Sequence, residues 1–455
     1  MSSTAAVLGG HGKLVKDIGS TVGMRFAALP IAFVASIVLA RSLQPSGKGA
    51  YTTVMTLGEL AVVVGGLGVS TASVFYLARE QGRAAVHVRR VVVGLSLAIG
   101  AAVSLFLVAV AVASASVGLS AAVTWALIAL CPLGVLSLTR GAFESFLRAQ
   151  QLVRTINGVA LLASAAFLVA VVGTSIEGWL KPAGAVSLRV GVVGIAVLLL
   201  LVSVRRRGIS VGRPSLEPGA ARSLLLFGLP YASYSIVQNF SNRIDYFLVG
   251  AFDNSAAVGV YSIAVAQAEL LWIVPTAVGF VLFPRVAARS RNAGGSQGDE
   301  TAALVRWTVL VTVLGAGLLG ALADPITTLV YGNAFAGAVA PLRVLLIGVA
   351  AFALAQVLSG FLLGSGRLRP LVLLSGAGFL CNLGANLVLI PRFGITGAAA
   401  SSAISYSVVG LGCAAVAGRR HPELAASALI PRPSLLLADV RRLMAQRHGH
   451  EPEAR

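Results

Sequence analysis

The chain has 455 residues, of which 57% are hydrophobic and only 11% charged. A soluble domain would carry about a quarter charged residues, so the composition excludes an ordinary soluble protein. The net charge of +19 alone would suggest a nucleic-acid partner, but the basic residues are spread between long apolar segments, and we expect no such partner.

Apolar segments of roughly 20 residues follow one another along the chain, and each is long enough to cross a bilayer as a helix. We therefore predict an all-α polytopic membrane protein with about twelve transmembrane helices. The first segment is too long for the apolar region of a signal peptide, so none is expected to be cleaved. The predicted spans are 20–40, 50–77, 91–113, 119–139, 157–174, 184–204, 224–250, 257–283, 303–322, 340–363, 370–390 and 395–417.

The basic residues predict the orientation. With the N-terminus inside, the outer segments hold few of them, whereas the inner segments hold most of the arginines and a basic tail. This bias predicts a multi-pass protein of the cell membrane with both termini in the cytoplasm, where its basic residues contact anionic lipid head groups. The basic residues on the outer side are Arg41, Lys48, Lys181, Arg189 and Arg392.

The segment 205–222, RRRGISVGRPSLEPGAAR, divides the chain into two groups of six spans. We predict an N-terminal six-helix bundle (1–204), a basic cytoplasmic linker (205–222), a C-terminal six-helix bundle (223–417) and a basic cytoplasmic tail (418–455). Halves with an even number of spans enter the membrane in the same orientation, which allows a parallel duplication.

A shift of 210 residues supports that duplication. It places GAYTTVMTLGEL (49–60) over GVYSIAVAQAEL (259–270), so that Glu59 matches Glu269. Acidic residues at this depth are rare, and a shared one therefore counts for more than shared leucines. The two bundles are predicted to be pseudo-symmetric, and the alternative is chance similarity between helices of like composition.

The seventh span carries a polar stripe. On a helical wheel its polar side chains fall on one arc, and its apolar side chains on the opposite arc. Such a helix faces a wet cavity or polar partners on one side. The stripe consists of Ser235, Gln238, Asn239, Asn242, Arg243, Asp245 and Tyr246.

Two interpretations of these charges stay open. Arg243 and Asp245 lie on opposite flanks of the arc, so each needs a partner on another helix or on a ligand. In a structural network, Asp245 would pair with an arginine elsewhere and Arg243 would cap carbonyls. Arg25 either snorkels to the surface or forms a cationic wall. Glu59 and Glu269 either act in coupling or gating, or form salt bridges to arginines.

The three cysteines fall inside spans and are treated as small apolar residues, and no metal-binding spacing is seen.

The stretch LARSLQPSGKGAYTTVMTLGELAVVVGGLGVSTASVFYLARE (39–80) resembles the opening signature of polysaccharide flippases in the multidrug/oligosaccharidyl-lipid/polysaccharide exporter superfamily. Gln44 stands where that family usually has glycine. The segment NRIDYFLVGAFDNSAAVGVYSIA (242–264) resembles a second family stretch, and segments 331–348 and 386–406 agree in order. The resemblance covers residues 15–417.

The resemblance implies two six-helix bundles around a cavity that alternates between membrane sides, a lipid-linked saccharide as cargo, and no enzymatic chemistry. We expect a polyprenyl-diphosphate-linked oligosaccharide, whose diphosphate a guanidinium can bind with two parallel hydrogen bonds. Expected partners are membrane lipids, a polysaccharide polymerase and glycosyltransferases. No cofactor is expected unless H⁺ or Na⁺ couples transport. The predicted substrate-binding residues are Arg25, Gln238, Asn239, Asn242 and Arg243, and the predicted coupling or charge-balancing residues are Glu59, Asp245 and Glu269.

Three alternatives remain at this stage. A cation-coupled multidrug exporter of the same superfamily would suit the intramembrane acids, but basic residues in the spans are equally numerous and argue against a strongly acidic pocket. A membrane glycosyltransferase or polymerase should carry catalytic acids in a large outer loop, and the outer loops here are short. The third alternative is a scaffold without transport.

Overall fold

A computed structural model describes residues 2–118, 120–289, 297–419, 421, 422 and 424, without the side chains of residues 2–29, 280, 281, 283–285, 287–289 and 297–300. All regular structure in these residues is helical, as predicted. The α-helices are α1 Ser2–Gly66, α2 Val69–Leu77, α3 Gly82–Ser116, α4 Ala121–Leu130, α5 Leu133–Ala149, α6 Val153–Ile176, α7 Pro182–Arg206, α8 Pro218–Phe252, α9 Ser255–Glu269, α10 Ile273–Arg289, α11 Gln297–Ala321, α12 Ala323–Tyr331, α13 Val339–Gly364 and α14 Leu368–Gly418. Two 3₁₀ helices, η1 Leu270–Trp272 and η2 Asn333–Ala338, join α9 to α10 and α12 to α13.

The protein is a polytopic membrane protein. By length and composition, 8 of its described helices could cross a membrane, or 9 when the bent pair Pro30–Gly66 and Val69–Leu77 counts as one span. Helix α14 holds the last two predicted spans, joined at a kink. Helix α8, the predicted seventh span, has 35 residues but is not among these helices. Its polar stripe lowers its hydropathy, as expected for a helix that turns one face away from lipid.

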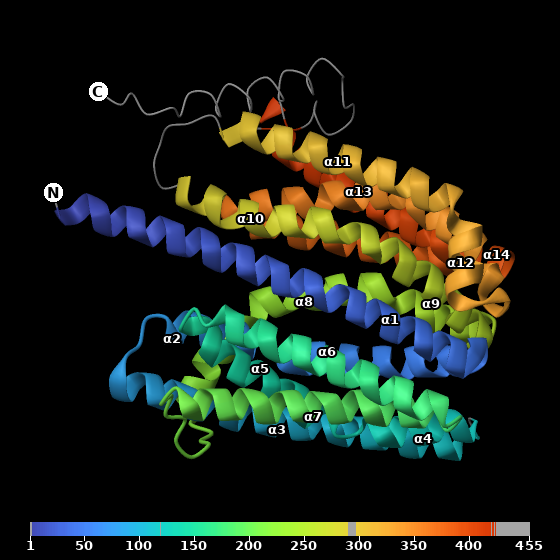
Figure 1. Cartoon of the computed structure of the whole chain (residues 1–455), viewed down its shortest axis with the longest axis horizontal. Helices are drawn as coiled ribbons and strands as arrows, with labels where there is room; N and C mark the ends of the chain where they lie inside the picture. The colour runs from blue at the N-terminus through green and yellow to red at the C-terminus, as the bar shows by residue number, and fades with distance from the viewer. Residues whose placement is uncertain (1, 119, 290–296, 420, 423, 425–455) are drawn as a thin grey trace. The chain divides into compact units, whose positions relative to one another are not determined.

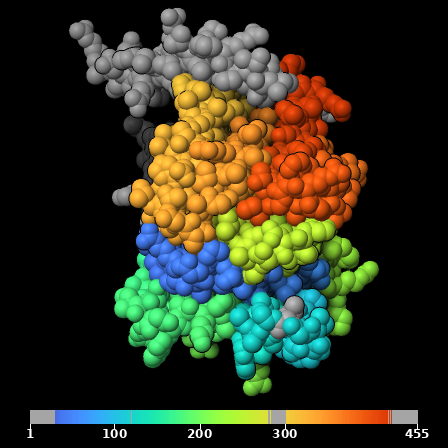
Figure 2. Space-filling model, turned by 90° about the vertical axis from the view of Figure 1, so that its right-hand side faces the viewer, coloured from blue at the N-terminus to red at the C-terminus, as the bar shows by residue number. Residues whose placement is uncertain are grey.

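The helices form two compact units. Unit 1 comprises Met1–Asn239 and Ser255–Gly259, and unit 2 comprises Phe240–Asn254 and Val260–Arg455. In unit 1, α5, α6 and α7 run side by side (Figure 1) around a core of aliphatic and aromatic side chains such as Phe146 and Leu200. In unit 2, α13 packs along α14, and their orange and red surfaces lie directly against each other in Figure 2. The predicted bundle boundaries at 204 and 223 remain a prediction based on membrane topology.

Two long helices are each broken at a residue with positive φ. Gln44 in α1 has φ 55° and ψ 173°, and Gly394 in α14 has φ 55° and ψ −137°. Only glycine adopts a positive φ without steric cost. This explains why the resembling family usually has glycine at the position of Gln44. The side-chain amide of Gln44 donates to the Arg41 carbonyl at 2.6 Å, which helps to hold the turn.

The 210-residue repeat appears in a reciprocal contact inside unit 1. A Cβ added to Gly49 would lie 1.6 Å from the Ser255 carbonyl oxygen, and one added to Gly259 would lie 2.0 Å from the Pro45 carbonyl oxygen. The two pairs exchange places when 210 is added to the residue numbers. The two segments that the predicted repeat matches therefore meet in a reciprocal contact, and any side chain at either glycine would push the backbones apart.

Candidate functional site

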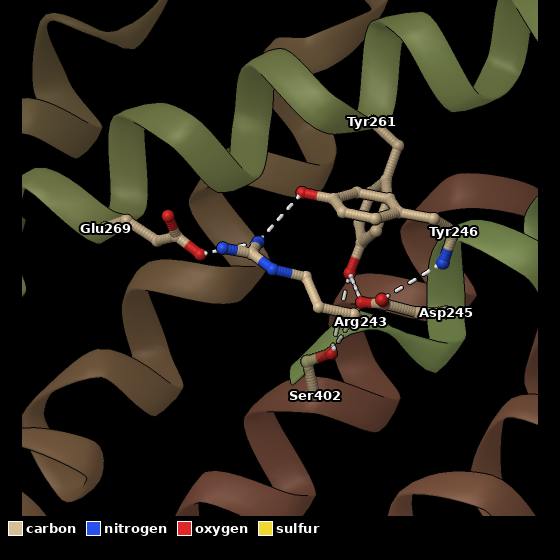
Figure 3. Close-up of polar contacts among 6 residues, drawn as sticks. All are labelled: Arg243, Asp245, Tyr246, Tyr261, Glu269 and Ser402. Atoms are coloured by element: carbon tan, nitrogen blue, oxygen red, sulfur yellow. Dashed lines mark hydrogen bonds and ion pairs between the residues drawn. The ribbon is translucent and has the colours of Figure 1, made fainter. Parts of the chain in front are cut away.

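The polar stripe of α8 continues into unit 2, to which the helix belongs from Phe240 onward. Its two charged residues, Arg243 and Asp245, therefore lie in unit 2. Figure 3 shows that Arg243 and Asp245 point to different partners, as their positions on the helical wheel predict. Arg243 reaches toward the end of α9, whereas Asp245 faces α9 and α14. The two charges are therefore held by separate contacts.

Asp245 is almost fully buried, with 3% of its surface exposed. Its Oδ2 accepts hydrogen bonds from the Tyr261 hydroxyl at 2.5 Å and the Ser402 hydroxyl at 3.2 Å. Its Oδ1 accepts one from the backbone N–H of Tyr246 at 3.0 Å. A buried carboxylate needs such donors, because losing water without replacement costs several kcal/mol. These three contacts orient the carboxylate within unit 2 (Figure 3).

The Asp245 contacts continue into α14. Asn382 and Asn386 are fully buried, and Nδ2 of Asn386 donates to Oδ1 of Asn382 at 2.8 Å. Asn382 in turn lies 3.5 Å from the Ser402 hydroxyl, at the limit of a hydrogen bond. Asn386 Oδ1 has no hydrogen-bond partner among the described residues. The network therefore contains a buried oxygen with unused acceptor capacity.

Asn382, Asn386 and Ser402 are not among the site residues predicted from the sequence. Asn382 and Asn386 are four residues apart in the eleventh predicted span, so they share one helix face. Two amides on one face of an apolar helix indicate that this face makes a polar contact. Ser402 gave no comparable signal, because serine is common in membrane helices.

Arg243 forms an ion pair between helices. Its Nη1 lies 2.9 Å from Oε1 of Glu269 and donates to the Tyr246 hydroxyl at 3.3 Å (Figure 3). The Arg243 and Glu269 side chains are 29% and 27% exposed. The structure thus brings together two of the predicted site residues, and it does so by the interhelical bridge that the sequence left as one of two interpretations.

The remaining predicted residues lie elsewhere. Asn239, in unit 1, donates to the Ser235 carbonyl at 2.8 Å, and Gln238 is half-buried. Asn242 has a buried Oδ1 without a hydrogen-bond partner in the described part of the chain. Glu59 is exposed on α1 in unit 1. Arg25 lies in α1, but its side chain is outside the described residues.

The side chains of this site can bind ligands and can exchange one anionic partner for another. The described residues hold no group of three or more His, Cys, Asp or Glu side chains that could bind a metal ion. A guanidinium held by one carboxylate can exchange that carboxylate for another anion, because both offer oxygens to the same N–H donors. The buried amides can accept or donate hydrogen bonds to hydroxyl groups.

Comparison with known families and structures gives a consistent result. A family model described as "Polysaccharide biosynthesis protein" matches residues 14–290. No curated protein matches the chain.

Several solved transporters share the fold. One, described as an inward-facing multidrug resistance MATE family transporter of the MOP superfamily, is 15% identical with a TM-score of 0.73, over 87% of this chain and 95% of that one. The lipid II flippase MurJ, in an inward closed conformation, is 12% identical with a TM-score of 0.73, over 92% of each chain. The eukaryotic MATE transporter AtDTX14 is 16% identical with a TM-score of 0.59, over 91% of this chain and 98% of that one. At these identities the likeness concerns the fold alone.

Proposed function

The chain belongs to the polysaccharide biosynthesis protein family, and from this premise we propose that it is a flippase for a lipid-linked oligosaccharide. The cargo would be a polyprenyl-diphosphate-linked oligosaccharide, carried across the cytoplasmic membrane by alternating access for cell-surface polysaccharide synthesis. The family match over residues 14–290 carries this proposal. The fold likeness of this chain to a structure described as a lipid II flippase supports the proposal.

The ion pair of unit 2 suggests which group balances the charge of Arg243 before cargo binds. Arg243 would bind the diphosphate, and Glu269 would balance its charge when no cargo is present, since the two side chains now lie 2.9 Å apart. A diphosphate offers more charge and more oxygens than one carboxylate, so it would compete well for the guanidinium. Arg25 is proposed as a second cation.

The polar stripe supports a saccharide rather than a purely lipidic cargo. The buried Oδ1 of Asn242, which has no hydrogen-bond partner among the described residues, could accept a hydrogen bond from a glycan hydroxyl. Gln238 and Asn239 are proposed to make similar contacts. Asp245 is proposed to balance charge or to bind H⁺ or Na⁺, and Glu59 to do so in unit 1. A polysaccharide polymerase and glycosyltransferases would act after and before this step.

Removal of the gene from its native cell tests the proposal. We expect lipid-linked oligosaccharide to accumulate with its glycan accessible only from the cytoplasmic side, and the intact gene to restore export. Unchanged export, with no accumulated intermediate, would contradict the flippase function.

The same strain, in which the gene is removed, also tests the alternative function of a multidrug exporter. Pairing of Glu269 with Arg243 leaves less uncompensated negative charge for a cationic drug, which favours the flippase. A strain that keeps normal surface polysaccharide but gains sensitivity to cationic drugs would reverse this preference.

A further inference from the structure

A cavity lies in unit 1, lined by residues between Phe143 and Gly212. It has a volume of about 460 Å³, within the roughly 300–1,000 Å³ usual for small-molecule sites. It is lined by residues of α5, of the end of α7 and of the loop that follows α7. Its lining residues are Phe143, Leu201, Arg205, Gly208, Ile209, Ser210, Val211 and Gly212.

The loop wall of this cavity is fastened to α3. The backbone N–H of Ser215 donates to the Arg90 carbonyl at 3.1 Å, and Nε of Arg90 donates to the Arg213 carbonyl at 2.9 Å. His87 and Glu217 lie 3.2 Å apart at the end of the same loop. The cavity wall therefore has a defined position.

The lining is chemically divided. Phe143, Leu201 and Val211 supply apolar surface, whereas Ser210 and Arg205 supply a hydroxyl and a cation. Positive φ values at Gly208 (66°) and Gly212 (70°) let the loop turn sharply at both ends of this wall. An apolar wall beside a cationic group fits an amphiphile with an anionic head.

Arg205 is the cation available to such a head group. On the neighbouring α5, Glu144 pairs with Arg140 at 2.8 Å and with Arg148 at 2.9 Å. Arg207 donates to the Thr155 hydroxyl at 2.7 Å. Arg205 is exposed and has no ion pair among the described residues. An incoming phosphate would therefore displace no carboxylate there.

We propose that this cavity binds an anionic glycerophospholipid, with the phosphate on Arg205 and the acyl chains leaving along Leu201 and Phe143. The predicted topology puts this end of α7 at the cytoplasmic leaflet, where anionic lipids attract basic residues. The apolar wall favours a lipid over a free phosphate, which would leave that surface uncovered. The site is independent of the proposed flippase function.

Binding to the detergent-purified full chain tests the proposal, with native mass spectrometry as the measurement. The probes are dioctanoyl phosphatidylglycerol, dioctanoyl phosphatidylcholine and glycerol phosphate. We expect phosphatidylglycerol to bind best and Arg205→Ala to weaken it about tenfold, because one charge-assisted hydrogen-bonding partner is lost. Arg206→Ala removes the same charge from an adjacent residue that does not line the cavity, and should change binding by less than about twofold.

A second variant tests the apolar wall. Val211→Ser should weaken phosphatidylglycerol binding and leave glycerol phosphate binding unchanged. Equal losses in Arg205→Ala and Arg206→Ala would reduce the site to diffuse electrostatic attraction. Equal binding of phosphatidylcholine, or binding of glycerol phosphate as tight as that of the lipid, would also overturn the proposal.

Discussion

The two units use the same repeat positions in different ways. Tyr51 and Glu59 in unit 1 correspond to Tyr261 and Glu269 in unit 2. In unit 2, Tyr261 is fully buried and donates to Asp245, and Glu269 pairs with Arg243. In unit 1, the ring of Tyr51 lies 5.2 Å from the Lys48 ammonium, and Glu59 is exposed.

The reason lies on the helix that precedes each pair. The counterparts of Arg243 and Asp245 at an offset of 210 are Phe33 and Ala35. Among the described side chains, the acid shared by both repeats therefore forms an ion pair only in unit 2, where Glu269 contacts Arg243. The predicted repeat therefore carries the polar network on one side, and the variants below test whether transport depends on that asymmetry.

The largest expected effect is on transport. Arg243→Ala and Arg25→Ala should abolish most export while the protein still inserts, because the diphosphate loses its cationic partners. Arg243→Lys should rescue export only partly, since lysine lacks the planar fork. The measurement is complementation of a flippase-deficient strain with protein levels checked. Normal export in both alanine variants would remove these arginines from the site.

Asp245→Ala gives unit 2 the residue that unit 1 has at the matching position. It should lower the free energy of unfolding by about 3 kcal/mol, because the donors from Tyr261, Ser402 and the Tyr246 backbone lose their acceptor. Denaturant unfolding of the purified protein measures this. Asp253→Ala, at an exposed position on the same chain segment, is the control and should change stability by less than about 0.5 kcal/mol.

The more conservative Asp245→Asn variant separates coupling from charge balance. If Asp245 binds the coupling cation, the variant should change how transport depends on Na⁺ or pH, since a neutral amide neither titrates nor attracts a cation strongly. We expect this change. An unchanged dependence combined with lower stability would assign Asp245 to charge balance alone.

Glu269→Gln and Glu59→Gln compare the matched acids directly. The first should cost about 2 kcal/mol of stability, because it removes the carboxylate that pairs with the half-buried Arg243. The second should cost less than about 0.5 kcal/mol, because Glu59 is exposed. Parallel thermal-unfolding curves check both. Equal losses would show that the two repeats use their acids alike.

The last comparison concerns the kinks in α1 and α14, where the expected effect is smaller than for Glu269→Gln. Gln44→Gly should raise the free energy of unfolding by about 1 kcal/mol, since glycine adopts the φ of 55° without strain. Gly394 already relieves the corresponding strain in α14, so Gly394→Ala should lower stability. A destabilised Gln44→Gly protein would mean that the 2.6 Å hydrogen bond to the Arg41 carbonyl outweighs the strain.

The sequence by itself determined the all-helical membrane fold and the positions of the helices. Each predicted span falls within a described helix or helix pair, apart from a few residues: residue 119, which opens the fourth span, is outside the described residues, Ser120 precedes α4, Leu322 follows α11, and the eighth span includes η1. Apolar length is a local property, and the need to satisfy backbone hydrogen bonds in lipid leaves little choice but a helix. The polar stripe of α8 could also be predicted from the sequence, because helical periodicity places its residues on one face.

Only the tertiary structure decided which partners these residues take. Nothing local to Arg243 selects Glu269, which is 26 residues away, and nothing local to Asp245 selects Ser402 in α14, which is 157 residues away. The amides Asn382 and Asn386 join the network for the same reason. Partner choice depends on which helix faces pack together, and packing in a membrane follows side-chain shape and hydrogen bonding between helices distant in sequence.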